Sequence, residues 1–576
     1  MLFLGMVTAG LVGAAILLWM AIDVEALIRS GGDAPPPVKE IVARVELPEL
    51  PATGSWTAYI YESPATAHFF PDSQYHVQLK GRWESLLQEV GARVTRISNA
   101  DEIYALDTEL IVLASAVCLD AAERESIRTH IERGGQLLAT WAIGARDGDC
   151  KWDGYDFLQE ITDASAVSPL DGRPFSYLTT PAGLPISTGL PPGQRVELST
   201  EAWIALNTEE PGIFWSDWSL NPLAGPRGGA MVAAITRKTV YGGRVAWFGY
   251  QLGVGAYELD RRIVERMAAN ALLWASGHVL VDVSPWPAGY RSALAVTQDV
   301  EHSHRNSRRL ARRMQQLDVP VTFFAVSQLV REEAVLAEQL RSAGEIGSHS
   351  ADHRQVGGWP LSKQLASLNR TFADISAWSG EAPLGFRPPR EEFDSATLEA
   401  WRRVGGLYVA ATNSARSAAP ELLRVKSGPV VVLPRVVDDD YAVMVIRGER
   451  SADSLAAALH GGLEKMRSLG GLDLLTVHTQ LIDSERRIAA IAVVARSAVE
   501  AGDVWIATGA EIAKWWASRS ELELEVECRD DGSALLTVTN GGEVPVSSAW
   551  LRVHLPEEPR SYAAPEVGDE ILRSRY

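Results

Sequence analysis

The chain has 576 residues, of which 46% are hydrophobic and 22% are charged, and its formal net charge at pH 7 is −19. This composition is typical of folded globular domains and argues against a disordered chain. The negative charge argues against nucleic acid as the main partner, because phosphate binding needs clustered Lys and Arg. The three cysteines form no CxxC pair, so no thiolate zinc site is expected.

The N-terminal residues 1–22 carry no charged side chain and are predicted to form a transmembrane anchor, since about 20 apolar residues span a bilayer core. A cleaved signal peptide is the alternative, but no basic segment precedes the apolar run and no A-x-A site precedes Asp23. No Lys or Arg lies before the span and Arg29 follows it, so charge placement does not favour export. Residues 23–54 include GGDAPPP and are predicted to be a linker.

Residues 55–278 alternate between strand-like and helix-like segments, which predicts a doubly wound α/β domain. The run Glu109–Val117 is continuously apolar, as expected of a strand buried on both faces of a parallel sheet. Strands are expected at Thr57–Tyr61, Glu109–Val117, Gln136–Ile143 and Gly243–Gly253, and helices at Leu79–Val90, Arg261–Gly277 and between the capping residue Asp120 and Gly134.

The segment LIVLASAVCLDAAERESIRTHIERGGQLLAT resembles the class I glutamine amidotransferase-like fold in its non-catalytic form. No catalytic triad is expected, because Cys118 lacks a Gly-rich elbow and no His of this region lies in an H-x-E pair. Cys118 and Cys150 each follow a predicted strand of the same sheet. Both a disulfide between them and two buried free thiols agree with this placement.

The second half of the chain carries the residues with catalytic chemistry. His349 and His353 are four residues apart, so on a helical turn both imidazoles would face one way. Neutral imidazole is a good ligand for zinc or a similar divalent metal. Upstream, the predicted strand that begins at Ser292 ends in Asp299 and Glu301, and strand ends carry the catalytic groups in α/β barrels.

These motifs, in this order, resemble the NodB-like polysaccharide deacetylases of carbohydrate esterase family four over about 240 residues. The matching segments are Thr297 to Val300, Val319 to Phe324, His349 to His353, Arg387 to Pro389 and Leu475 to His478. The resemblance implies a distorted (β/α) barrel over residues 279–520 and a polysaccharide substrate.

The resemblance also implies roles for single residues. A divalent metal, Zn with Co or Ni as alternatives, would be held by His349 and His353. Asp299 stands at the position of the catalytic base, His478 at that of the acid, and Arg387 at that of the residue that orients the base. Val300 replaces the third metal ligand of the family, and Glu301 would substitute for it from the same face of the strand. Alternatively, Asp299 itself binds the metal, and the base is lost or supplied by Glu301.

Several positions depart from the family pattern: Gln298 replaces Phe, Arg390 and Glu391 follow the R-x-P motif, and Thr479 follows the late His. The predicted reaction is removal of N-acetyl groups from a hexosamine-containing polysaccharide of the cell envelope or an exported one, by a protein whose globular part lies outside the cytoplasm. A degenerate sugar-binding or scaffold barrel and a hydrolase of a non-sugar amide are the alternatives. His302, His304 and the run Asp438–Asp440 are expected to be solvated.

The C-terminal residues 521–576 are predicted to form a small β-rich appendage. Glu521–Cys528 alternates charged and apolar residues with the period of a half-buried strand. A hairpin signal follows at Asp531-Gly532, and a third strand is expected at Ser548–Leu555.

Overall fold

The computed structural model describes residues 50–576 except 52, 54–55, 71–72, 168–176, 200–202, 226–227, 303, 332, 412–415, 529–533, 543–545, 547, 556–558, 564–571 and 576. The predicted anchor, residues 1–22, and nearly all of the predicted linker lie outside this part of the chain. Among the helices that are described, none combines the length and the apolar character that crossing a bilayer requires.

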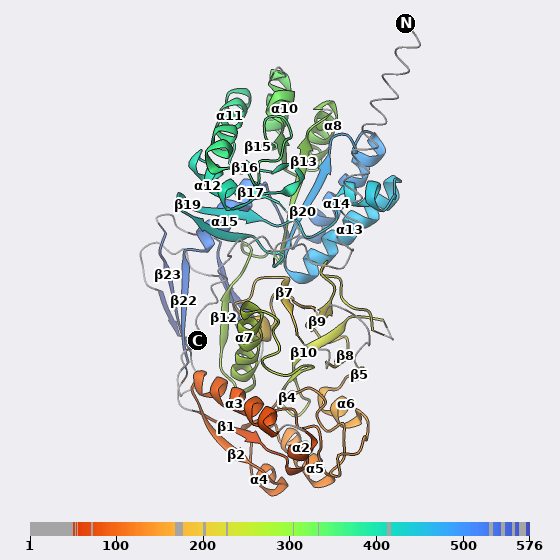
Figure 1. Cartoon of the computed structure of the whole chain (residues 1–576), viewed down its shortest axis with the longest axis vertical. Coiled ribbons are helices and arrows are strands. Elements are labelled where there is room, and N and C mark those ends of the chain that lie inside the picture. Colours follow the sequence, from red (N-terminus) through yellow and green to blue (C-terminus); the bar gives the residue numbers. More distant parts are fainter. Residues whose placement is uncertain are drawn as a thin grey trace.

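The first α/β unit lies at the lower end of the molecule in Figure 1 and begins with a parallel sheet. Its elements are β1 (Trp56–Tyr61), α2 (Pro64–Phe69), α3 (Ser73–Glu89), β2 (Ala92–Ile97), α4 (Ala100–Tyr104), β3 (Leu110–Leu113), α5 (Ala121–Glu132), β4 (Gln136–Thr140), α6 (Asp156–Thr162), β5 (Ser165–Val167), β6 (Tyr177–Thr180), η1 (Pro185–Ser187), β7 (Gln194–Glu197), β8 (Ala205–Asn207), β9 (Gly212–Ser216), β10 (Met231–Lys238), β11 (Arg244–Phe248) and α7 (Glu258–Ala275).

The sheet of this unit is doubly wound over its first half. Strands β2, β1, β3, β4 and β11 pair in parallel in that order. Helices α3 and α7 pack against one face, and α4, α5 and α6 pack against the other. The sheet then continues through antiparallel strands β10, β9, β6 and β7, which the sequence did not predict. The resemblance to an amidotransferase domain stays a prediction.

The second α/β unit occupies the upper end of the molecule in Figure 1. Its elements are β13 (Ser292–Val300), α8 (His304–Gln315), β14 (Val321–Ala325), α9 (Ser327–Val330), α10 (Ala334–Arg341), β15 (Gly344–Ser348), α11 (Leu361–Ser379), β16 (Gly385–Phe386), η2 (Pro389–Glu391), α12 (Ser395–Arg403), β17 (Tyr408–Ala410), β18 (Glu421–Val425), β19 (Gly428–Leu433), η3 (Ala442–Ile446), α13 (Ala452–Leu469), β20 (Leu472–His478), α14 (Glu485–Ala501), β21 (Val504–Ile506) and α15 (Gly509–Arg519).

The strands of the second unit form an open, distorted barrel. The ladder runs β18-β19-β17-β16-β15-β14-β13-β20, with β21 also paired to β13, and only the β18–β19 pair is antiparallel. Every residue of β13 is buried, because one face of the strand meets the barrel interior and the other meets the helices. Parallel strands point their carboxyl ends to one side, so the loops that follow them share one rim.

The C-terminal strands form a small β layer beside β12 (Leu280–Val283), and Figure 1 shows it along the flank of the molecule. Its strands are β22 (Leu522–Cys528), β23 (Ala534–Asn540), β24 (Trp550–His554), β25 (Pro559–Ala563) and β26 (Leu572–Arg575). The alternating burial of β22 agrees with the predicted half-buried strand. Apolar residues of β12, β23 and β24 share one core.

The two α/β units are joined by a tight seam. Arg416 Nη2 donates to Asp260 Oδ1 at 2.7 Å, and the backbone N–H of Ala182 donates to Leu469 O at 2.9 Å. Gly470 follows α13 at φ +76°, where a Cβ atom would lie 2.8 Å from the Ala182 Cβ. A side chain at this position would be strained by the positive φ and would clash with Ala182 across the seam.

Candidate active site

Strand β13 places two carboxylates at the rim of the barrel. Asp299 lies on the inward side, one residue before Val300, which is buried in the outer core between strands and helices. Glu301 follows the strand end, and its side chain is 4% exposed. Val300 therefore faces away from the site, and the alternation of the strand brings Asp299 and Glu301 to the same side.

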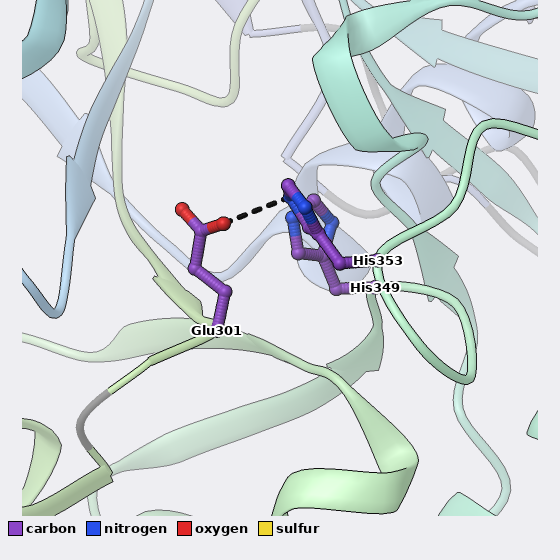
Figure 2. A group of neighbouring side chains, drawn as sticks. All are labelled: Glu301, His349 and His353. Carbon is purple, nitrogen blue, oxygen red and sulfur yellow. Dashed lines mark ion pairs between the residues drawn. The ribbon is translucent and has the colours of Figure 1, made fainter. Parts of the chain in front are cut away.

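His349 and His353 come from the loop after β15, not from the helical turn that their spacing suggested. Ser350 and His353 have φ values of 66° and 60°, and this left-handed backbone turns the loop back on itself. Figure 2 shows Glu301, His349 and His353 directed toward one another. His353 Nε2 lies 2.8 Å from Glu301 Oε2, and ligand atoms of all three residues lie within 4.8 Å of one another.

This group fits a divalent metal by its chemistry and by the hydrogen bonds around it. His349 Nδ1–H donates to the Arg387 carbonyl at 2.7 Å, which leaves Nε2 as the ligand atom. Gln480 Nε2 donates to Glu301 Oε1 at 2.9 Å. Burial raises the pKa of Glu301, but the hydrogen bond from His353 and the neighbouring imidazoles outweigh it and hold that pKa well below its usual range. Two imidazoles and a carboxylate suit zinc and similar ions.

Asp299 occupies the centre of the site. Its Oδ2 lies 3.8 Å from His349 Nε2 and 3.7 Å from His478 Nε2. Arg387 Nε lies 3.7 Å from Asp299 Oδ1, so the pair is electrostatic rather than hydrogen-bonded, and Oδ1 accepts no hydrogen bond from any described residue. The Arg387 guanidinium is fixed instead by Thr476 and Thr297, whose hydroxyls it reaches at 2.8 and 3.2 Å.

His478 ends β20 directly beside Asp299, its register partner on β13. Asp440 accepts hydrogen bonds from the backbone N–H of His478 at 2.8 Å and from Nδ1–H at 2.6 Å. Burial lowers the pKa of His478, but the carboxylate of Asp440 outweighs it and raises that pKa well above its usual range. The imidazole therefore carries a proton on Nε2, which faces Asp299.

The acidic run at 438–440 was expected to be solvated, and this expectation was wrong for two of its three residues. Asp440 is fully buried beneath His478, and Asp439 is 8% exposed. Only Asp438 is solvent-exposed, where it pairs with Arg447. The run follows the end of β19 at the carboxyl side of the same sheet. Since catalytic groups in such barrels lie after strand ends, this position could have indicated a place at the site.

Comparison with known proteins identifies this part of the chain. Residues 290–409 match the family model of polysaccharide deacetylases. This segment is a polysaccharide deacetylase domain. The match includes Asp299, Glu301, His349, His353 and Arg387, and it ends before Asp440 and His478.

Two curated proteins are similar over part of their length. A bifunctional xylanase/xylan deacetylase of Cellvibrio japonicus is 34% identical over 86 residues, 15% of this chain and 13% of that protein. The uncharacterized protein YlxY of Bacillus subtilis (strain 168) is 25% identical over 173 residues, 29% of this chain and 52% of that protein. The chain thus spans from about an eighth to about half of the relatives' lengths. A solved CE4 family pseudoenzyme from Bacillus anthracis is 18% identical with a TM-score of 0.30, and the match covers 40% of this chain and 70% of that chain.

The other histidines near the deacetylase centre take different surroundings. His302 has a side chain that is 55% exposed, as expected, with Nδ1 3.6 Å from Glu301 Oε2. His304 is less exposed than expected, and its Nε2 lies 3.3 Å from Glu333 Oε1. Neither belongs to the group of three possible metal ligands.

The first α/β unit holds the remaining predicted residues. Cys118 and Cys150 are joined in a disulfide with their Cα atoms 5.1 Å apart. After β3, the backbone adopts a left-handed conformation at Ser115, whose φ is 57°, and not at Cys118. Ser115 is fully buried, and its hydroxyl lies 3.2 Å from that of Thr140. A nucleophile must reach its substrate, and the buried hydroxyl of Ser115 does not meet this requirement.

Proposed function

We propose that the protein is a metal-dependent hydrolase that removes N-acetyl groups from a hexosamine-containing polysaccharide. The observation that carries this proposal is the convergence on Asp299. One carboxylate lies within 3.8 Å of the imidazole of His349, the guanidinium of Arg387 and the imidazole of His478. A base, an orienting cation, a protonated acid and a set of metal ligands therefore meet at one rim of the barrel.

Glu301, His349 and His353 are the residues that would hold the metal, with zinc the first choice and cobalt or nickel as alternatives. These residues would hold a divalent ion where it would lower the pKa of a water molecule and polarise the carbonyl of the amide. Glu301 is already ionised for this role. Burial raises its pKa, but the surrounding imidazoles lower that pKa by more.

The chain's own groups move the protons. Asp299 Oδ1, which no described donor occupies, accepts the proton of the attacking water. Arg387 orients Asp299 by its charge at 3.7 Å. His478 Nε2–H donates a proton to the departing amine, and Asp440 holds the imidazole in the protonated state that this step needs.

The location outside the cytoplasm is part of the proposal. The first support is the apolar segment 1–22. The second is the disulfide between Cys118 and Cys150, because disulfides persist in oxidising compartments and are rare in the cytosol. The predicted substrate, an envelope or exported polymer, is found on the same side of the membrane.

The test is release of acetate by the zinc-loaded protein from three substrates side by side: chitin oligomers, acetylated peptidoglycan fragments and acetylated simple amines. Turnover of a sugar substrate that disappears in Asp299→Asn is the expected result. Turnover of the non-sugar amides alone would replace the substrate class. Binding of sugar without turnover of any substrate would leave a degenerate carbohydrate-binding barrel.

A further inference from the structure

Arg435 joins two segments of the rim that are far apart in sequence. It follows the end of β19, and its side chain is 17% exposed. Its guanidinium donates to both carboxylate oxygens of Glu391, at 2.5 and 2.7 Å, and to Val437 O at 3.1 Å. Nη1 lies 3.6 Å from Asp439 Oδ2. A bidentate pair of this kind fixes direction as well as distance.

Glu391 belongs to the segment that supports the base. Arg390 and Glu391 have φ values of 58° and 56°, so two consecutive residues with side chains adopt the left-handed region. Such backbone costs free energy and persists only where surrounding contacts impose it. The bidentate pair with Arg435 is one such contact at Glu391. The same segment begins at Arg387, whose guanidinium faces Asp299 and whose carbonyl orients His349.

Asp439 belongs to the segment that supports the acid. Its Oδ1 accepts the backbone N–H of Ala442 at 2.7 Å, which fixes the start of η3. The next residue, Asp440, holds His478 through two hydrogen bonds. A shift of Asp439 would therefore also move the carboxylate of Asp440, which holds His478.

We propose that Arg435 is a positioning residue for the deacetylase reaction, one that sets the base side and the acid side of the site relative to each other through Glu391 and Asp439. This inference rests on the proposed function. It goes beyond it by assigning a role to a residue outside the family match and without contact to the reacting atoms. Arg435 bridges the 387–391 segment and the 438–440 segment, which are far apart in the sequence.

The first test variant is Arg435→Lys, because lysine keeps the positive charge but cannot form the bidentate pair. The matched control is Arg467→Lys. Arg467 also forms a two-nitrogen pair, with Asp503 at 2.7 and 3.1 Å, but Asp503 precedes β21 at the opposite end of the barrel. A second test variant, Glu391→Gln, keeps the shape of the side chain and removes its charge.

Three quantities are measured on the full zinc-loaded chain: kcat and KM for acetate release, bound zinc, and backbone hydrogen exchange of residues 387–392 and 438–446. Arg435→Lys and Glu391→Gln are expected to lower kcat by about 100-fold, as a displacement of about 1 Å does. KM is expected to change by less than about threefold. Zinc content is expected to stay unchanged, and exchange is expected to become faster in both segments.

The control Arg467→Lys is expected to change none of these quantities. Faster exchange in only one segment, or in neither, would overturn the role of Arg435 even if the wild type shows no turnover. An equal loss of kcat in the control would also overturn it. A wild type without turnover on any acetylated substrate would overturn the proposed function separately, since the exchange data do not depend on activity.

Discussion

The two α/β units use the carboxyl ends of their parallel strands in opposite ways. In the first unit, hydrogen bonds between neighbouring loops close the ends of β1 and β3. The hydroxyls of Ser63 and Thr66 both donate to Cys118 O at 2.8 Å, and Ser115 is fully buried beside Thr140. In the second unit the same ends carry Asp299, Glu301 and three imidazoles within hydrogen-bonding or ion-pair range.

This difference singles out the second rim as the candidate active site. Buried polar atoms are nearly always hydrogen-bonded, so exceptions need a cause. Asp299 Oδ1 and Arg387 Nε are such exceptions at the second rim. Groups of opposite charge that are close but not hydrogen-bonded are suited to act on a third molecule.

The largest expected effect comes from Asp299→Asn at the second rim. We expect kcat to fall by about 100- to 10,000-fold, because the proton acceptor is removed. Bound zinc should remain, since Asp299 is not among the three ligands that lie together. Acetate release and zinc content are measured on the same sample, with Ser115→Ala as the control at the first rim. Loss of zinc in Asp299→Asn would instead make Asp299 a metal ligand.

A smaller effect is expected from opening the disulfide of the first unit. The double variant Cys118→Ala/Cys150→Ala frees a loop with a sequence separation of 32 residues. It should lower the free energy of unfolding by about 2–4 kcal/mol, as measured by urea titration. Acetate release per folded molecule should stay the same. Dithiothreitol should destabilise the wild type in the same way; a reductant without effect would contradict the structural role.

The smallest expected effect is a change in stability from a buried carboxyl group of the barrel that contacts no catalytic residue. Asp473 of β20 is 1% exposed, neither of its oxygens accepts a hydrogen bond from a described residue, and burial raises its pKa to about 7. A pKa above the unfolded value stabilises the folded state at low pH, and this contribution is lost as pH rises from about 4 to about 7.

Asparagine does not titrate. Between pH 5 and pH 8, the stability of Asp473→Asn should therefore improve relative to the wild type by on the order of 1 kcal/mol. Chemical denaturation at the two pH values measures this difference. A difference that does not vary with pH would show that Asp473 stays ionised in the folded protein, as Glu301 does.

Local patterns predicted much of the fold and most of the site. Apolar runs placed β13, β14 and β20, and the position of Asp299, Glu301 and His478 at strand ends placed these residues at one rim. The capping of α5 by Asp120 was also predicted correctly. These features depend on alternation and on capping chemistry, which neighbouring residues determine.

The features that were missed depend on the backbone or on distant residues. The predicted strand Glu109–Val117 ends at Leu113, because the backbone turns at Ser115. His349 and His353 meet through a left-handed loop, which their spacing does not reveal. Asp440 supports His478 across 38 residues, and no local pattern joins them.

The proposed function depends on one divalent metal held at the rim of the second unit by Glu301, His349 and His353. The most direct measurement is the metal content of the purified protein after reconstitution with zinc, beside the variant His349→Ala/His353→Ala. We expect about one zinc per wild-type chain and none bound tightly by the variant. Equal zinc in both proteins, or none in the wild type after reconstitution with zinc, cobalt or nickel, would contradict it.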